Sequence, residues 1–137
     1  MKPLTTMACA VLLALALALP AAASADLTGR WEAEFMGNRV ECHLEQRGKF
    51  LYGVAYVFTR TGERNTYHLA GMMDNGRIRA QHGSGNYFEG ALQGADTAAG
   101  TFYFKDGPSV PMQAKRTAKG RTAPGGLEWP AGFPPAN

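Results

Sequence analysis

Apolar and polar residues alternate between residues 29 and 116, and short Gly-, Asn- and Asp-rich turns interrupt the alternation. Asn-Gly and Asp-Gly favour hairpins because both residue types tolerate a positive φ. The pattern predicts eight strands, over residues 29–36, 39–46, 50–58, 64–73, 77–82, 87–93, 98–105 and 109–116. Because every connection is short, each strand should pair antiparallel with the next, and eight such strands close well into a barrel. We therefore predict an all-β protein whose residues 26–116 form an eight-stranded antiparallel up-and-down β-barrel.

The alternation also assigns the faces of the strands. In the first strand, Trp31, Ala33 and Phe35 should point inward, while Glu32 and Glu34 point outward. The same phase directs these further residues inward: Val40, Cys42, Leu44, Ile78, Ala80, His82, Val110, Met112, Ala114 and Arg116. An outer face this rich in charge argues against an outer-membrane barrel, whose outside must be apolar.

The third strand, residues 50–58, is apolar on both faces. One face must lie outside, so either an apolar stripe is exposed or something covers it. The cover could be the C-terminal tail or a second copy of the chain in a homo-oligomer. Residues 117–137 lack periodicity and are rich in Pro, Gly and Ala, which predicts an irregular, extended tail. The tail carries Leu127, Trp129 and Phe133, and we expect it to lie on the barrel. The alternative is a free tail.

Residues 1–25 have the features of an export signal. Lys2 precedes the 13-residue apolar run 7–19, which is too short for a membrane span of about 20 residues. Ala23-Ser24-Ala25 offers the small residues that a signal peptidase accepts, so cleavage is expected before Asp26. The sequence predicts a periplasmic or secreted protein without a membrane span.

Composition narrows the function classes. The chain of 137 residues is 45% apolar and 18% charged, with a formal charge of +3. These values predict a folded domain and no binding of nucleic acid, because basic and acidic residues are interspersed. Cys42 is the only cysteine after the expected cleavage, so an internal disulfide is not expected.

The sequence also argues against an enzyme. Cys42 and His43 are neighbours on a strand and point to opposite faces, so they cannot act as nucleophile and base. The carboxylates of the first two strands should lie outside and pair with Arg30, Arg39 or Arg47; these carboxylates are Glu32, Glu34, Glu41 and Glu45. We expect His43 and His68 to be isolated on the surface, and we predict no metal or other cofactor.

The interior could be filled or hollow. Side chains often fill an eight-stranded barrel, and this is the ordinary expectation, but the many small inward residues here favour a cavity. The leading hypothesis is therefore the binding of a small or apolar ligand in the mouth of the barrel. The candidate contacts are Trp31, Tyr67, His82 and Arg116, of which Arg116 would act as a lid contact or an anion partner.

Two family resemblances extend this interpretation. Gly29-Arg30-Trp31 and Arg116 resemble the calycin barrels, the lipocalins and avidins, in which a Gly-x-Trp of the first strand packs beneath a basic side chain of the last strand. That resemblance implies one closed end and a ligand at the other. Residues 84–88 resemble the Ser-Gly-x-x-Tyr loop of the periplasmic C-type lysozyme inhibitors. This implies an alternative, a protein-binding module whose loop 83–88 acts through Ser84, Asn86, Tyr87 and Phe88.

Overall fold

The computed structural model describes residues 25–136, so the predicted export signal lies outside the described residues except for Ala25. The described part is all-β and contains no helix. The strands are β1 (Gly29–Phe35), β2 (Asn38–Arg47), β3 (Phe50–Phe58), β4 (Arg64–Asp74), β5 (Arg77–His82), β6 (Tyr87–Leu92), β7 (Thr97–Tyr103) and β8 (Ser109–Lys119). The largest difference from the predicted bounds is at the end of β8, which continues to Lys119 instead of residue 116.

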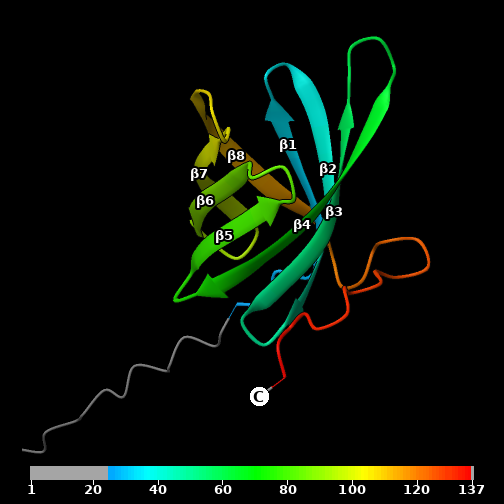
Figure 1. The fold of residues 1–137 in the computed structure, drawn as a ribbon, viewed down its shortest axis with the longest axis vertical. Helices are drawn as coiled ribbons and strands as arrows, with labels where there is room; N and C mark the ends of the chain where they lie inside the picture. The colour runs from blue at the N-terminus through cyan, green and yellow to red at the C-terminus, as the bar shows by residue number, and fades with distance from the viewer. Residues whose placement is uncertain (1–24, 137) are drawn as a thin grey trace, which may run out of the picture.

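The eight strands form a closed barrel. Each strand pairs antiparallel with the next, and β1 also pairs antiparallel with β8, which confirms the predicted up-and-down topology. We call the end with the β1–β2, β3–β4, β5–β6 and β7–β8 turns the mouth, and the other end the closed end. Figure 1 shows the β1–β2 and β3–β4 hairpins projecting beyond the rest of the barrel at the mouth.

Paired glycines let β6 and β7 approach closely. Gly90 lies opposite Gly100, and a Cβ on Gly100 would collide with the backbone carbonyl of Glu89. A Cβ on Gly90 would lie 2.5 Å from the carbonyl oxygen of Ala99. Glycine is required where backbones approach this closely at the bends of a barrel.

The closed end contains the hydrophobic core. Its buried members are Leu27, Trp31, Leu51, Met73, Ile78 and Ala98. Trp31 is 4% exposed and points inward, as its place in the alternation predicts. Its indole Nε1 donates a hydrogen bond of 2.9 Å to the carbonyl of Leu27, so the single polar atom of the ring is satisfied.

Arg116 closes this end over Trp31. A β-bulge in the β1–β8 pairing, at Arg30 and Trp31, brings Trp31 opposite Arg116. The guanidinium carbon lies 5.2 Å from the indole ring centroid, within the range of a cation–π contact. Gly29 permits this contact, because a Cβ there would lie 2.9 Å from the Cδ of Arg116 and would collide with the carbonyl of Ala118.

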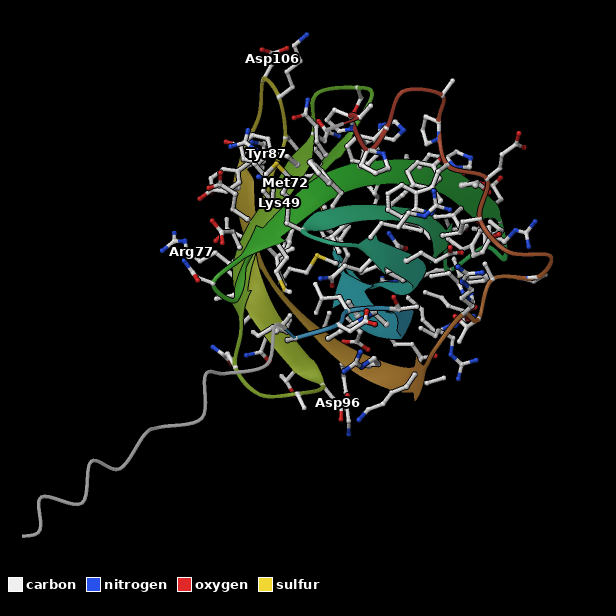
Figure 2. The ribbon with its side chains drawn as sticks, turned by 90° about the horizontal axis from the view of Figure 1, so that it is seen from below. Lys49, Met72, Arg77, Tyr87, Asp96 and Asp106 are labelled. Atoms are coloured by element: carbon white, nitrogen blue, oxygen red, sulfur yellow. The ribbon has the colours of Figure 1, made fainter. Side chains whose placement is uncertain are left out.

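The guanidinium of Arg116 makes four hydrogen bonds to protein groups. Its Nε donates to the carboxylate of Asp96 at 2.8 Å. Its other nitrogens donate to the carbonyls of Asp26, Thr28 and Ala95. Figure 2 looks at the molecule from below and shows Asp96 on the rim of the ring of strands, on the side away from the tail. Arg116 therefore ties the segment that precedes β1, the β6–β7 turn and β8 together.

The outer face of β3 is covered by the tail of the same chain. The ring of Trp129 lies 5.7 Å from that of Tyr52, and the ring of Phe133 lies 5.6 Å from that of Phe50. The guanidinium of Arg47 lies 4.4 Å from the Trp129 ring. In Figure 1 the orange-to-red tail leaves β8 and passes beside this part of the sheet. The apolar outer stripe is thus in contact with protein.

Two expectations about the outer face are wrong for the same reason. His43 is 6% exposed and Glu45 is 5% exposed, although both point outward. His43 bonds through Nδ1 to the hydroxyl of Thr122 at 2.7 Å and through Nε2 to Glu41 at 2.8 Å. Glu45 accepts hydrogen bonds from Leu127 N and Trp129 Nε1 instead of pairing with an arginine of the neighbouring strands. The tail removes both side chains from water.

Glu41 keeps one expected partner, the guanidinium of Arg39 at 3.3 Å. Burial alone would raise its pKa, but hydrogen bonds from His43 and Arg39 outweigh burial, and the pKa lies below its usual value.

No helix among residues 25–136 is long and apolar enough to cross a membrane.

Candidate functional site

The barrel is hollow. A cavity of about 500 Å³ runs from the core at the closed end to the mouth. This volume is typical of small-molecule sites, and the expectation of an interior filled by side chains is wrong. The cavity walls come from these residues: Leu27, Trp31, Phe35, Met36, Asn38, Val40, Cys42, Leu44, Leu51, Ala55, Val57, Thr59, Asn65, Tyr67, Leu69, Ile78, Ala80, His82, Asn86, Phe88, Ala98, Phe102, Phe104, Met112 and Ala114.

Apolar and polar groups occupy different depths of this cavity. Leu27, Trp31, Leu51, Ile78 and Ala98 belong both to the lining and to the core of the closed end. The polar lining residues instead lie at strand ends or turns near the mouth: Asn38, Thr59, Asn65, Tyr67, His82 and Asn86. A molecule that enters the lumen would therefore meet hydrogen-bonding groups at the rim and only apolar surface further in.

The polar residues that line the mouth of the cavity are asparagine, threonine, tyrosine and histidine. None of the lining residues in the described part of the chain is Asp, Glu, Lys or Arg. Three asparagines from different hairpins, Asn38, Asn65 and Asn86, contribute amide groups at the mouth. Such groups orient a ligand through hydrogen bonds without attracting one sign of charge.

The four candidate contacts divide between the two ends. Trp31 forms part of the floor, whereas Tyr67 and His82 come together at the mouth, with their rings edge to face and 5.2 Å apart. Tyr67 is 37% exposed, so its ring is accessible from the mouth. Arg116 lies outside the cavity lining, on the far side of Trp31. Arg116 therefore covers Trp31 at the closed end, whereas Tyr67 and His82 lie together at the mouth.

The hydrogen bonds of His82 define its neutral tautomer. The backbone N–H of Ser84 donates to Nδ1 at 3.1 Å, and the Ser84 hydroxyl lies 2.9 Å from the same nitrogen. Because Nδ1 accepts a hydrogen bond, the proton of the neutral ring lies on Nε2. Within residues 25–136, Nε2 makes no hydrogen bond. In this tautomer one N–H donor of His82 is left over at the mouth.

Cys42 faces the lumen, as predicted. Its partial exposure is toward the cavity that it lines. Burial raises the pKa of this thiol to about 12, so it stays protonated at neutral pH and is a poor nucleophile. Among residues 25–136, no group of three or more His, Cys, Asp or Glu side chains is arranged to hold a metal ion.

The 83–88 segment has two kinds of residue. Ser84 bonds to His82, and the Asn86 side chain accepts a hydrogen bond from Lys105 N at 3.0 Å, so both stabilise the turn at the mouth. Tyr87 stacks on Tyr103 at 4.8 Å, while Phe88 points into the cavity. Only part of this segment is thus presented to the outside, and its role in binding a protein stays a prediction.

A second hollow, of about 570 Å³, lies between the tail and the outer face of β3 and β4. Its lining includes Tyr52, Tyr56, His68 and Trp129. His68 is not isolated, because the Tyr52 hydroxyl lies 3.2 Å from its Nδ1. The tail occupies the surface that we considered, as an alternative, for a homo-oligomer, and that alternative stays a prediction.

Sequence reasoning missed several residues at the mouth. Asn38 has the same parity as Val40, and Asn65 the same parity as Tyr67, so strict alternation already placed both amides on the inner face. Met36 carries no such signal. It has a positive φ of 50° in the β1–β2 turn and is 64% exposed, although it also lines the opening of the cavity.

Comparisons with known proteins add a fold likeness only. No protein-family model matches this chain, and no curated protein matches it. One similar solved structure is described as the de novo design of a fluorescence-activating beta barrel; it is 16% identical, with a TM-score of 0.48, over 66% of this chain and 93% of that chain. The contact between Trp31 and Arg116 that the calycin resemblance implies is present, but membership of that family is not shown.

Proposed function

We propose that this protein is an exported, non-catalytic binding protein that holds one small apolar ligand in the lumen of its barrel. The cavity carries the proposal: about 500 Å³, apolar along its depth, and polar only near the mouth. Apolar surface that moves from water into such a cavity gains about 25 cal/mol per Å². A ligand of suitable size would therefore bind by burial and be oriented by the rim.

Export rests on the sequence of residues 1–25, and the non-catalytic role rests on the chemistry of the lumen. The one thiol there is held protonated, and the carboxylates of the first two strands point outward. A lumen of this kind favours retention of a ligand over its conversion.

Dye binding to a lumen-filling variant tests the proposal. Ala80 is 8% exposed and lines the cavity, so Ala80→Phe would place a ring in the space that the ligand needs. We expect the neutral dye N-phenyl-1-naphthylamine to bind the wild-type barrel saturably, at one molecule per chain. Its affinity should fall at least about tenfold in Ala80→Phe, because overlapping volumes exclude the dye.

Gln81→Phe is the matched control, because Gln81 is the next residue of β5 and is exposed on the outer face. This variant should bind the dye like the wild type, and circular dichroism should show that both variants are folded. Equal binding by Ala80→Phe and the wild type, or no dye binding by the wild type, would contradict the proposal.

A further inference from the structure

The geometry of the mouth points to one class of ligand: we infer that the lumen takes an uncharged molecule with an apolar body and a hydrogen-bond-accepting oxygen at one end. This inference rests on the proposed function and specifies its ligand. Aliphatic ketones, esters and alcohols belong to this class, whereas fatty-acid anions and alkylammonium ions do not.

The charge of the lining supports the first half of the inference. No Asp, Glu, Lys or Arg occurs among the described residues that line the cavity. A charged end group would therefore leave water without a partner of opposite charge, which is strongly unfavourable. A neutral polar group loses much less on the same transfer, and one hydrogen bond offsets that loss.

Two of the arginines near the mouth are held on the outer face, and a third, Arg60 of the β3–β4 turn, lies against Gly37 of the β1–β2 turn and does not line the cavity. The guanidinium of Arg39 lies 4.0 Å from the Phe58 ring and bonds to Glu41. That of Arg64 lies 4.7 Å from the Tyr56 ring, which also belongs to the outer face of β3. Neither side chain lines the cavity, so neither supplies the missing charge for a ligand inside the barrel.

His82 and Tyr67 support the second half. The Nδ1 of His82 already accepts a hydrogen bond from Ser84 N, so the donor that remains is Nε2–H. The Tyr67 ring meets the His82 ring edge to face, so a phenol and this imidazole belong to the same part of the rim. Both residues offer an N–H or O–H to an oxygen, and further amide donors come from Asn65, two residues before Tyr67 on β4, and from Asn38 at the start of β2.

A matched series of ten-carbon ligands tests the inference on the intact barrel. Decan-2-one, decan-1-ol, decanoate and decylammonium share a chain length and differ in the end group. Each would displace N-phenyl-1-naphthylamine from the protein at about pH 7.5, where the last two are ionised. We expect the ketone and the alcohol to bind at least tenfold more tightly than either ion.

The outcomes separate this inference from the proposed function. If the dye binds and decanoate or decylammonium displaces it as well as decan-2-one does, the inference is wrong while lumen binding stands. Displacement by none of the four overturns the inference as well. Failure of the dye itself to bind is the separate result that contradicts the proposed function.

A charge-swap variant tests where the end group lies. His82→Arg puts a guanidinium at the mouth, and it should raise the affinity for decanoate about tenfold or more relative to that for decan-2-one. Gln81→Arg adds the same charge one residue away on the outer face and should leave this ratio unchanged. An equal change in both variants would mean general attraction of anions and would overturn the placement of the ligand end at His82.

Discussion

The two ends of the barrel treat their polar groups in opposite ways. At the closed end, Arg116 donates to a carboxylate and to three backbone carbonyls, and it covers a buried Trp31. At the mouth, Tyr67 is partly exposed and the Nε2 of His82 makes no hydrogen bond within residues 25–136. Satisfied groups stabilise a fold, whereas groups with spare hydrogen-bonding capacity can recognise a ligand. Stability is therefore concentrated at the closed end, whereas the mouth has the spare hydrogen-bonding groups that we propose for ligand recognition.

Replacement of Trp31, on the floor of the lumen, should cause the largest change in the free energy of unfolding. Trp31→Ala deletes a 4% exposed side chain that contacts Leu27 and lies beneath Arg116. We expect a loss of about 3–5 kcal/mol in the free energy of unfolding, measured by urea denaturation, because both apolar contact and cavity terms contribute. Tyr67→Ala, at the exposed mouth, should cost about 1 kcal/mol or less. Equal losses in the two variants would contradict the assignment of stability to the closed end.

Arg116→Met should have the next largest effect. The variant keeps an apolar stem over Trp31 but removes the donors to Asp26, Thr28 and Ala95. A loss of about 2 kcal/mol is expected from urea denaturation, as is usual for hydrogen bonds to a charged group. Dye affinity should change little, because Arg116 lies outside the cavity lining. A folded variant that loses dye binding would show that Arg116 contributes to the ligand site.

Acid should weaken the closed end through Asp96. The hydrogen bond from Arg116 holds the pKa of this carboxyl below its ordinary value of 3.8. A group with a lowered folded-state pKa stabilises the fold above its unfolded pKa, and this contribution is lost as the pH falls through the folded-state pKa. Between pH 5 and about pH 2.5, the wild type should therefore lose more stability than Asp96→Asn, measured by urea midpoints. Parallel losses would mean that the Arg116 contact does not favour the ionised form.

The smallest change in the free energy of unfolding is expected when a single oxygen atom is removed at the mouth. Tyr67→Phe removes one hydroxyl that has no protein partner within residues 25–136, so unfolding should change by less than about 0.5 kcal/mol. The affinity for decan-2-one should still fall a few-fold, because one donor to the ligand oxygen is lost. Displacement titrations measure this change. The prediction is wrong if stability falls substantially while affinity does not.

The contrast between the ends also shows what the sequence could and could not predict. The inward positions of Trp31, Tyr67 and His82 follow from the period-two alternation of a strand, a local property. That the lumen is hollow depends on how close the strands come at positions such as Gly90 and Gly100, which is set by the whole barrel. The number of small residues in the sequence does not predict these distances between strands.

The tail shows a second limit. His43 and Glu45 alternate as outward residues, and a carboxylate on that face ordinarily lies in water. Their burial arises from hydrogen bonds to Thr122, Leu127 and Trp129, which are more than seventy residues away along the chain. Such contacts join an irregular segment to a strand and leave no periodic signal.

Heavy-atom quenching of the two tryptophans tests the central claim most directly, because Trp31 lies on the floor of the lumen and Trp129 lies outside it, beside the second hollow. Trp129→Phe leaves Trp31 as the only tryptophan of residues 25–136, and Trp31→Phe leaves Trp129. Bound decan-1-ol with bromine on its far end should quench the fluorescence of Trp31 and leave that of Trp129 unchanged, since the apolar end reaches the floor. Quenching of Trp129 with Trp31 unaffected would place the ligand outside the barrel and contradict the account.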